Sequence, residues 1–455
     1  MAGSGTKSGT AVAQRLTGFF HIGERGSTPG REVIAGLTTF GAMSYIVIVN
    51  PAILSAAGMN LHSVIVATAF ASMLGTLIMA LWANLPIALA PGMGSNVIFA
   101  QIVVVKLGIP YQTALTMVLI GAVLFLILSV TRFREKIVDG FPVSIRIGMQ
   151  CGIGLLIAYI GLSNAGLLVH QNGQAGFGDL TDPAILLAFI GLLATPILVA
   201  LRVPAAFLIS IVAITAAGLF IHSHGGPATT VLPDSFVELP ELPRELLFAF
   251  NFREFFSHFF LVLPITVYFF LSDFFSATAT LIGVTRRGGI MDADGHIPNA
   301  RRAYAADGLA SIFGAMLGTS TVVAFVESAT GVEAGGRTGL TGVVVAALFG
   351  TALFLWPLIA CIPPQATAPA LVLVGILMME GIKDLDFSRV EDVIPPMLIM
   401  IITVITTDLM IGLASACFVY TAIVAATRQW QKVTRMLLTL DAIFVVYIIL
   451  AQQVR

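Results

Sequence analysis

The segment 317-LGTSTVVAFVESATGVEAGGRTG-339 places a carboxylate, Glu327, among small residues between two strongly apolar runs. Its β-branched start, 319-TSTVV-323, favours an extended chain. A charged side chain at membrane depth is costly, so an acid in such a place usually has a function. The segment therefore predicts an extended piece that runs into a half-helix, with Glu327 at the mouth of that half-helix.

A second segment, 85-LPIALAPGMGSNVIFA-100, holds two prolines and two glycines, which break the hydrogen bonds of a continuous helix. Unwound backbone at membrane depth is tolerated only where it is buried in protein or lines a cavity. Two such breaks are the best sequence pointer to a binding site near the bilayer midplane. If half-helices begin near Gly92 and near Val326, their N-terminal N–H groups converge from opposite sides.

The composition around these segments indicates a polytopic membrane protein. Of the 455 residues, 57% are hydrophobic and only 10% are charged, with a mean hydropathy of +0.97. These values lie far outside the range of soluble globular proteins. Apolar runs of about 17 to 25 residues can each cross the bilayer as a helix. We predict an all-α fold with about fourteen transmembrane segments, near 33–57, 62–82, 85–106, 112–131, 143–163, 183–201, 203–221, 258–284, 301–318, 320–334, 338–360, 366–381, 392–407 and 409–427.

Seven spans precede a polar linker and seven follow it. An odd number of spans in each half means that the halves enter the membrane in opposite senses, which is typical of inverted-repeat transporters. The predicted domains are a cytoplasmic N-terminal segment (1–30), a first repeat (31–222), an extracytoplasmic linker with an amphipathic helix at 244–257 (223–257), a second repeat (258–428) and a cytoplasmic or interfacial C-terminal segment (429–455).

The positive charges predict the orientation. Lys and Arg in short loops mark the cytoplasmic side. In this span scheme they all fall on the side of the N-terminus, and the opposite loop 164–182 contains two aspartates but no Lys or Arg. We therefore expect a multi-pass protein of the cell (inner) membrane with both termini in the cytoplasm.

Several classes of protein are disfavoured. A net charge of -1 without a basic face gives no sign of a nucleic-acid partner. The three cysteines show no CxxC or Cys/His spacing, so we expect neither a disulfide framework nor a metal site. No HExxH, GxSxG or P-loop motif occurs, and no soluble domain is evident that would hold a cofactor. An enzyme is therefore not expected.

Other polar residues in the spans are candidates for the site. Asp273 lies in mid-span in 269-FFLSDFFSATATLIG-283, where the alternative is a bond to a neighbouring helix end. Asn96 in GMGSN either holds a ligand or bonds a loose carbonyl. For Asp307, helix capping or a salt bridge with Arg301 or Arg302 competes with a role in proton coupling.

We expect Glu333 to pair with Arg337 near the cytoplasmic surface, and Asp408 to be a solvated acid in a turn. Aromatic rings in the spans are usually core or lipid-facing, but one or two can sandwich a flat ligand. The predicted substrate-binding residues are Glu327, Asp273, Asn96, Phe325, Tyr45, Gly92, Ser328 and Phe274, and the predicted proton-coupling residues are Asp273, Glu327 and Asp307.

Two acids and two half-helix ends suit a small planar ligand with N–H and C=O edges. Such a ligand can donate to carboxylates and accept from backbone N–H groups without carrying charge, and a nucleobase fits this description. One of the acids can take up a proton on the acidic side and release it on the other. The pattern thus predicts proton-coupled uptake in which one bundle rocks against the other.

Four segments carry a resemblance to a known family: 31-REVIAGLTTFGAMSYIVIVNPAILSAAGM-59, 85-LPIALAPGMGSN-96, 133-FREKIVDGFP-142 and 319-TSTVVAFVESATGVEAGGRTGLTGVV-344. They resemble the adenine/guanine/hypoxanthine permeases, the AzgA-like branch of the nucleobase/ascorbate transporter superfamily. The match extends from about residue 31 to 380.

The resemblance implies fourteen spans in a core and a gate domain, purine uptake with protons, and a homodimer through the gate domains. It also implies that Glu327, Asp273 and Asn96 hold the base. Relatives usually carry a second acid in the eighth span, where this chain has Ser276. The coupling or the choice of substrate is therefore expected to differ.

Two other functions stay open at this stage. The same architecture serves anions in related superfamilies, although two midplane acids would repel an anion. A membrane sensor or a channel is the second alternative, and paired broken helices favour alternating access over an open pore.

Overall fold

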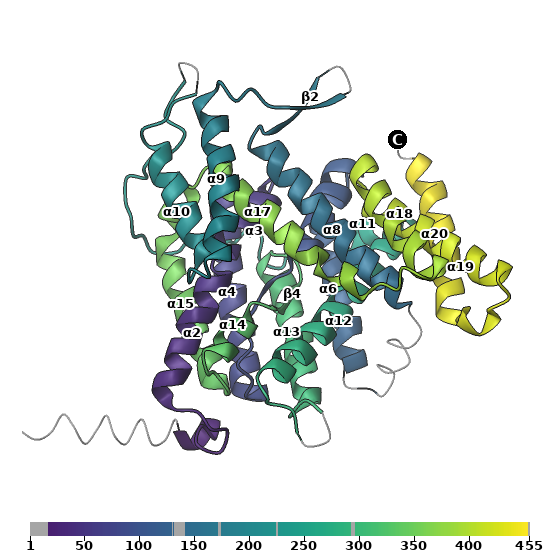
Figure 1. Ribbon diagram of the computed structural model, residues 1–455, viewed down its shortest axis with the longest axis horizontal. Helices are drawn as coiled ribbons and strands as arrows, with labels where there is room; N and C mark the ends of the chain where they lie inside the picture. Colours follow the sequence, from purple (N-terminus) through teal and green to yellow (C-terminus); the bar gives the residue numbers. More distant parts are fainter. Residues whose placement is uncertain are drawn as a thin grey trace, which may run out of the picture.

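The computed structural model describes residues 17–129, 131, 142–171, 174–223, 226–292 and 296–453. Most of these residues are helical, which confirms the predicted all-α class (Figure 1). The longer helices are α2 (Pro29–Met43), α3 (Ile46–Ser55), α4 (Leu61–Ile78), α6 (Tyr111–Ser129), α8 (Val143–Asn164), α9 (Pro183–Ala200), α10 (Ala206–Gly218), α12 (Phe259–Arg287), α13 (Ala300–Leu317), α15 (Gly339–Ala352), α17 (Pro364–Met378), α18 (Val390–Thr406), α19 (Leu409–Ala426) and α20 (Arg435–Gln453).

The shorter elements join or interrupt these helices. The strands are β1 (Leu89–Pro91), β2 (Leu168–Gln171), β3 (Gln174–Phe177) and β4 (Val322–Ala324), and the short helices are α5 (Met93–Val97), α11 (Phe252–Ser257), α14 (Ser328–Glu333) and α16 (Trp356–Ala360). Two π-helical stretches, η1 (Met79–Ala83) and η2 (Ile98–Lys106), extend α4 and α5, and 3-10 turns lie at η3 (Leu353–Leu355), η4 (Met379–Asp384) and η5 (Trp430–Lys432).

The order of the elements follows the predicted spans. Within the described residues, nine helices or helix pairs are long and apolar enough to cross a bilayer. Their outer faces expose large apolar side chains, for example Leu37 (52%), Ile197 (57%) and Ile376 (54%). Because a soluble protein rarely exposes so many such residues together, these faces suit lipid. The polytopic class is confirmed, and the number of crossings stays a prediction.

The helices pack in two groups. In one group, α8 packs along α17, α18 and α19, while α9 packs against α10 and α17. In the other, α4 packs against α3, α13 and α15, while α6 packs against α12 and α13. Figure 1 shows α18, α19 and α20 at one end of the long axis and β4 near the middle.

Both segments that were expected to break a helix contain a strand followed by a short helix. The two strands pair antiparallel, with Leu89 opposite Ala324 and Pro91 opposite Val322. Pro91 has no N–H to offer, so it stands at the end of this short ladder. The pairing brings residues more than 200 positions apart together in the interior.

Two predictions about the periphery need correction or completion. The amphipathic helix expected at 244–257 is limited to α11, because turns occupy 244–248. The C-terminal segment 429–455, expected to be cytoplasmic or interfacial, contains α20, which packs against α12 and α19 with Leu437, Phe444 and Tyr447 buried. The predicted cytoplasmic start and the motif at 133–142 lie largely outside the described residues.

Candidate functional site

The site is built around the crossing of β1 and β4. A backbone bond from Gly92 N to the Thr321 oxygen (2.8 Å) closes one end of the strand pair, and a bond from Phe325 N to the Ala88 oxygen (3.0 Å) closes the other. Because the strands are antiparallel, α5 and α14 leave the crossing from opposite ends. Gly92 suits this place, since a Cβ there would lie 3.2 Å from the Val323 side chain.

Glu327 stands directly before α14 and is half-buried. Its Oε1 accepts a hydrogen bond of 2.7 Å from the hydroxyl of Tyr45, which is buried just before α3. The Tyr45 ring also contacts Phe207 of α10, with 5.2 Å between the ring centroids. The Glu327 carboxylate is thus oriented by a buried hydroxyl, while the neighbouring Val326 is 61% exposed.

Asp273 of α12 is buried beside the same crossing. Its Oδ2 accepts a hydrogen bond of 3.2 Å from Ser311 of α13, and the hydroxyls of Ser95 and Thr321 lie close to the carboxylate. Its Oδ1 has no hydrogen-bond partner among the described residues. A buried carboxylate with a free oxygen can accept a further hydrogen bond or a proton.

Asp307 lies at the edge of β4 that does not pair with β1, and its position rules out one alternative left open by the sequence. Its Oδ1 accepts a hydrogen bond of 2.7 Å from the Ala324 N–H, and the side chain is completely buried in the middle of α13. It therefore neither caps the helix nor pairs with Arg301 or Arg302, which are exposed. The reason is spatial, because α13 turns Asp307 toward the unpaired edge of β4 rather than toward the helix start.

Four other predicted residues have well-defined surroundings. Ser328 accepts a bond of 3.0 Å from the Ala88 N–H and so ties α14 to the chain before β1. Phe325 is buried at the end of β4. Asn96 is fully buried and bonded to side chains of other elements. Phe274 packs in an aromatic cluster with Phe125, Phe270 and Phe275, so other protein rings surround its own ring on several sides.

Two predicted surface acids have other partners. Glu333 pairs with Arg287 at 3.4 Å, and the Arg337 guanidinium instead donates to backbone oxygens. Asp408 is not solvated: it is 2% exposed, caps α19 and pairs with Lys106 at 3.0 Å. Both predictions were wrong because the partners come from segments that are distant in sequence.

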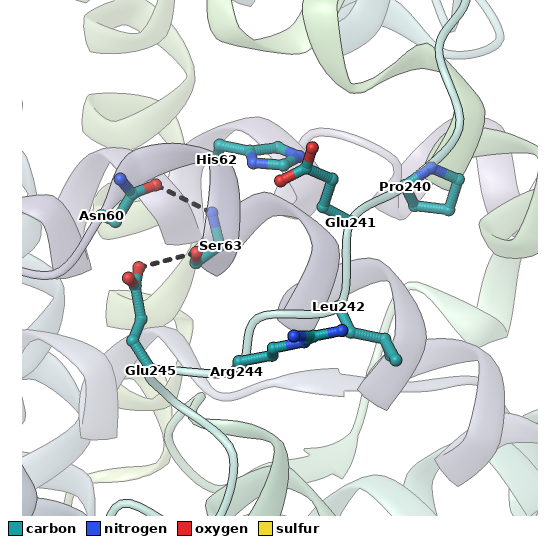
Figure 2. A pocket seen from close by; sticks show the side chains of 8 residues that line it. All are labelled: Asn60, His62, Ser63, Pro240, Glu241, Leu242, Arg244 and Glu245. Atoms are coloured by element: carbon teal, nitrogen blue, oxygen red, sulfur yellow. Dashed lines mark hydrogen bonds between the residues drawn. The ribbon is translucent and has the colours of Figure 1, made fainter.

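Among the described residues, two cavities lie away from the crossing. One of about 670 Å³ lies where the start of α4 meets the linker, and Figure 2 shows the side chains around it. There the Ser63 hydroxyl donates to Glu245 at 2.8 Å, and the His62 ring contacts the Trp356 ring at a tilt of 43° with centroids 3.9 Å apart. None of the predicted site residues lines this cavity. In the part of the chain that the structure describes, no group of three or more His, Cys, Asp or Glu residues is suited to hold a metal ion.

Some polar residues of this region were missed in the sequence. The hydroxyls of Ser311 and Ser320 looked like ordinary small residues of a span. Asn50, in contrast, gave a signal, because it is an amide inside the strongly apolar run 45-YIVIVNPAIL-54. A polar amide in such a run needs buried partners.

These features define an integral membrane protein in which two interrupted helical segments meet through a pair of short strands, with acidic side chains around the pair. The chain belongs to the nucleobase/ascorbate transporter family: residues 30–415 match the model described as "Permease family". It is therefore a membrane permease.

Named relatives extend over nearly the whole chain. It is 37% identical over 435 residues to the guanine/hypoxanthine permease PbuO of Bacillus subtilis. The alignment covers 94% of this chain and 98% of the relative. The chain is 36% identical over 437 residues to the adenine permease AdeQ of Escherichia coli, with 96% of both chains covered.

Solved structures confirm the fold. The transmembrane domain of the cyanobacterial bicarbonate transporter BicA superposes with a TM-score of 0.60 at 16% identity, over 84% of this chain and 96% of that one. Murine Slc26a9 in the inward-facing state superposes with a TM-score of 0.60 at 12% identity, over 88% of this chain and 68% of that one. At these identities the likeness concerns the fold alone.

Proposed function

We propose that this permease takes up purine nucleobases together with protons. The observation that carries the proposal is the carboxylate of Glu327, which is fixed by Tyr45 at the crossing of two strands next to a highly exposed residue. A carboxylate held in a fixed position is suited to accept hydrogen bonds from the N–H groups of a purine edge. The names of PbuO and AdeQ, relatives at 36–37% identity, support a purine as the substrate.

In this proposal the acids have different roles. Glu327 accepts hydrogen bonds from the base, and the backbone around Gly92 and Ser328 shapes the walls beside it. Asp273 takes up and releases the proton, because it is buried and one of its oxygens has no partner among the described residues. Asp307 holds β4 in place by accepting a hydrogen bond from the Ala324 N–H.

The two groups of helices supply the moving parts. Alternating access would result if the group that holds β1 and β4 moved against the group built around α8 and α17. We further propose an inverted repeat, a location in the cell membrane with cytoplasmic termini, and a homodimer. The anion alternative is disfavoured, because buried carboxylates repel an anion.

Uptake by proteoliposomes tests the substrate. With an inward proton gradient, the protein should accumulate labelled adenine, guanine or hypoxanthine. Glu327→Gln should abolish binding, because an amide presents only one acceptor oxygen without charge. Glu333→Gln is the matched control, since that acid pairs with Arg287 at the surface. The substrate assignment is wrong if the wild type neither takes up nor binds any of the three purines.

A second variant tests the coupling. Asp273→Asn cannot exchange a proton but keeps the size of the side chain. We expect it to bind purine, while its uptake no longer responds to the proton gradient. Coupling that persists in Asp273→Asn would remove this residue from the proton pathway.

A further inference from the structure

Asn50 lies at the centre of a buried polar network that joins four parts of the chain. It sits in α3 directly before Pro51 and is completely buried. Its amide nitrogen donates to the hydroxyl of Thr68 in α4 (2.7 Å) and to that of Thr319 (3.1 Å), just before β4. Its amide oxygen accepts from the side-chain nitrogen of Asn96 in α5.

The network continues from Asn96 to the second crossing segment. The Asn96 oxygen accepts a hydrogen bond from the hydroxyl of Ser320, which neighbours Thr319. Asn50 and Asn96 therefore both reach the two-residue stretch that leads into β4. All five side chains of the network are buried, and a buried polar group is costly when it loses its partner.

The network lies where the relative position of the two broken crossings is fixed. Asn96 belongs to the short helix that follows β1, and Thr319 and Ser320 precede β4. The strand pair itself contains only three residues on each side. So short a ladder gives few hydrogen bonds to hold the register, and the side-chain amides add a cross-link behind it.

We propose that Asn50 is a positioning residue for the purine site and that it acts as one unit with Asn96. In this arrangement Asn96 contributes to binding by fixing the crossing, because its oxygen is bonded to Ser320 and its nitrogen to Asn50. This inference rests on the proposed purine transport and deepens it. It also changes the expected role of Asn96 from a contact of the base to a support of the site.

A double-variant cycle tests the proposal. Asn50→Ala and Asn96→Ala should each raise the KM for purine uptake about tenfold, while the maximal rate per folded molecule changes less than about twofold. The double variant should be no worse than either single variant, since one missing member already breaks the unit. Effects on KM that multiply in the double variant would show that Asn96 contacts the base itself, and an unchanged KM in Asn50→Ala would also refute the proposal.

Asn60→Ala is the matched control. Asn60 caps α4 through its side chain and lies outside the network, so its loss should reduce stability and leave the KM unchanged. If Asn50→Ala does not fold, Thr319→Val provides the milder change, because it removes one acceptor of Asn50 and keeps the shape. A normal KM for Thr319→Val would then contradict the positioning role.

Failure of the proposed function can be recognised separately. If the wild type transports no purine, the purine assignment is wrong. The coupling between Asn50 and Asn96 is then tested by the melting temperatures of the wild type, the two single variants and the double variant. Non-additive losses for Asn50→Ala and Asn96→Ala would support the unit without any substrate. Additive losses would refute it.

Discussion

Breaking the ion pair between Lys106 and Asp408 should strongly destabilise the protein. Lys106 ends η2 in one group of helices, and Asp408 caps α19 in the other. The ammonium lies 3.0 Å from the Asp408 carboxylate and donates to the Thr406 oxygen at 2.8 Å. The carboxylate also accepts from the N–H groups of Met410 (3.0 Å) and Ile411 (3.3 Å). We predict that Lys106→Met leaves a buried carboxylate without its cation.

The magnitude follows from burial. Removing one partner of a fully buried pair costs about 3–5 kcal/mol. The Asp408 side chain is 2% exposed, but that of Lys106 is 22% exposed, so water can partly replace the ammonium. We therefore expect a loss of about 2–3 kcal/mol. Lys383→Met is the matched control, because Lys383 and Glu380 are 63% and 71% exposed and such pairs contribute about 0–1 kcal/mol.

The assay is thermal unfolding in a mild detergent, read as the remaining monodisperse protein after heating. Lys106→Met should melt well below both the wild type and Lys383→Met. Adding Asp408→Asn to Lys106→Met should restore part of the loss, because asparagine still caps α19 and leaves no unpaired charge. A melting temperature for Lys106→Met equal to that of Lys383→Met would refute the reasoning.

Three further changes test the packing and the site. Gly331→Ala should strongly reduce the yield of folded protein, because its Cβ would lie 2.6 Å from a backbone oxygen of α2, whereas Gly283→Ala meets nothing within 4 Å and should be tolerated in the same expression assay. Ser328→Ala should cost about 1–3 kcal/mol in the unfolding assay, since it leaves the N–H before β1 without its acceptor. Tyr45→Phe should weaken purine binding about tenfold in equilibrium titrations, because Glu327 loses the hydroxyl that orients it; an unchanged affinity would mean that the carboxylate is oriented without that bond.

The class of fold could be predicted from the sequence because lipid imposes simple rules on it. Long apolar runs must be helical in a bilayer, and each predicted span coincides with a helix or a strand and helix in the described residues. The interruptions near Gly92 and Glu327 were visible because proline, glycine and β-branched residues disfavour helix locally. The structure has strands in both places.

The partners of the acids could not be predicted in the same way. Lys106 and Asp408 are about 300 residues apart, and nothing local distinguishes Asp408 from a solvated turn residue. Asp307 lies within a few residues of two arginines, which made a local pair plausible, yet its partner is the backbone of β4. Hydrogen bonds and ion pairs depend on distances of a few ångströms, and only the packing of distant helices sets these distances.

Asn50 shows where a stricter reading of the sequence would have succeeded. An amide in an apolar span has two donors and one acceptor group that must all be satisfied internally. Such a residue therefore predicts further polar side chains in other spans, and the sequence offers hydroxyls next to both predicted breaks. The prediction of the two breaks made no use of this amide. In the structure the amide and the breaks are connected, since two of the three side-chain hydrogen bonds of Asn50 join it to Thr319, which precedes β4, and to Asn96, which follows β1. A polar residue in a membrane span is thus best interpreted together with the nearest unwound backbone, because each can satisfy the hydrogen-bonding needs of the other.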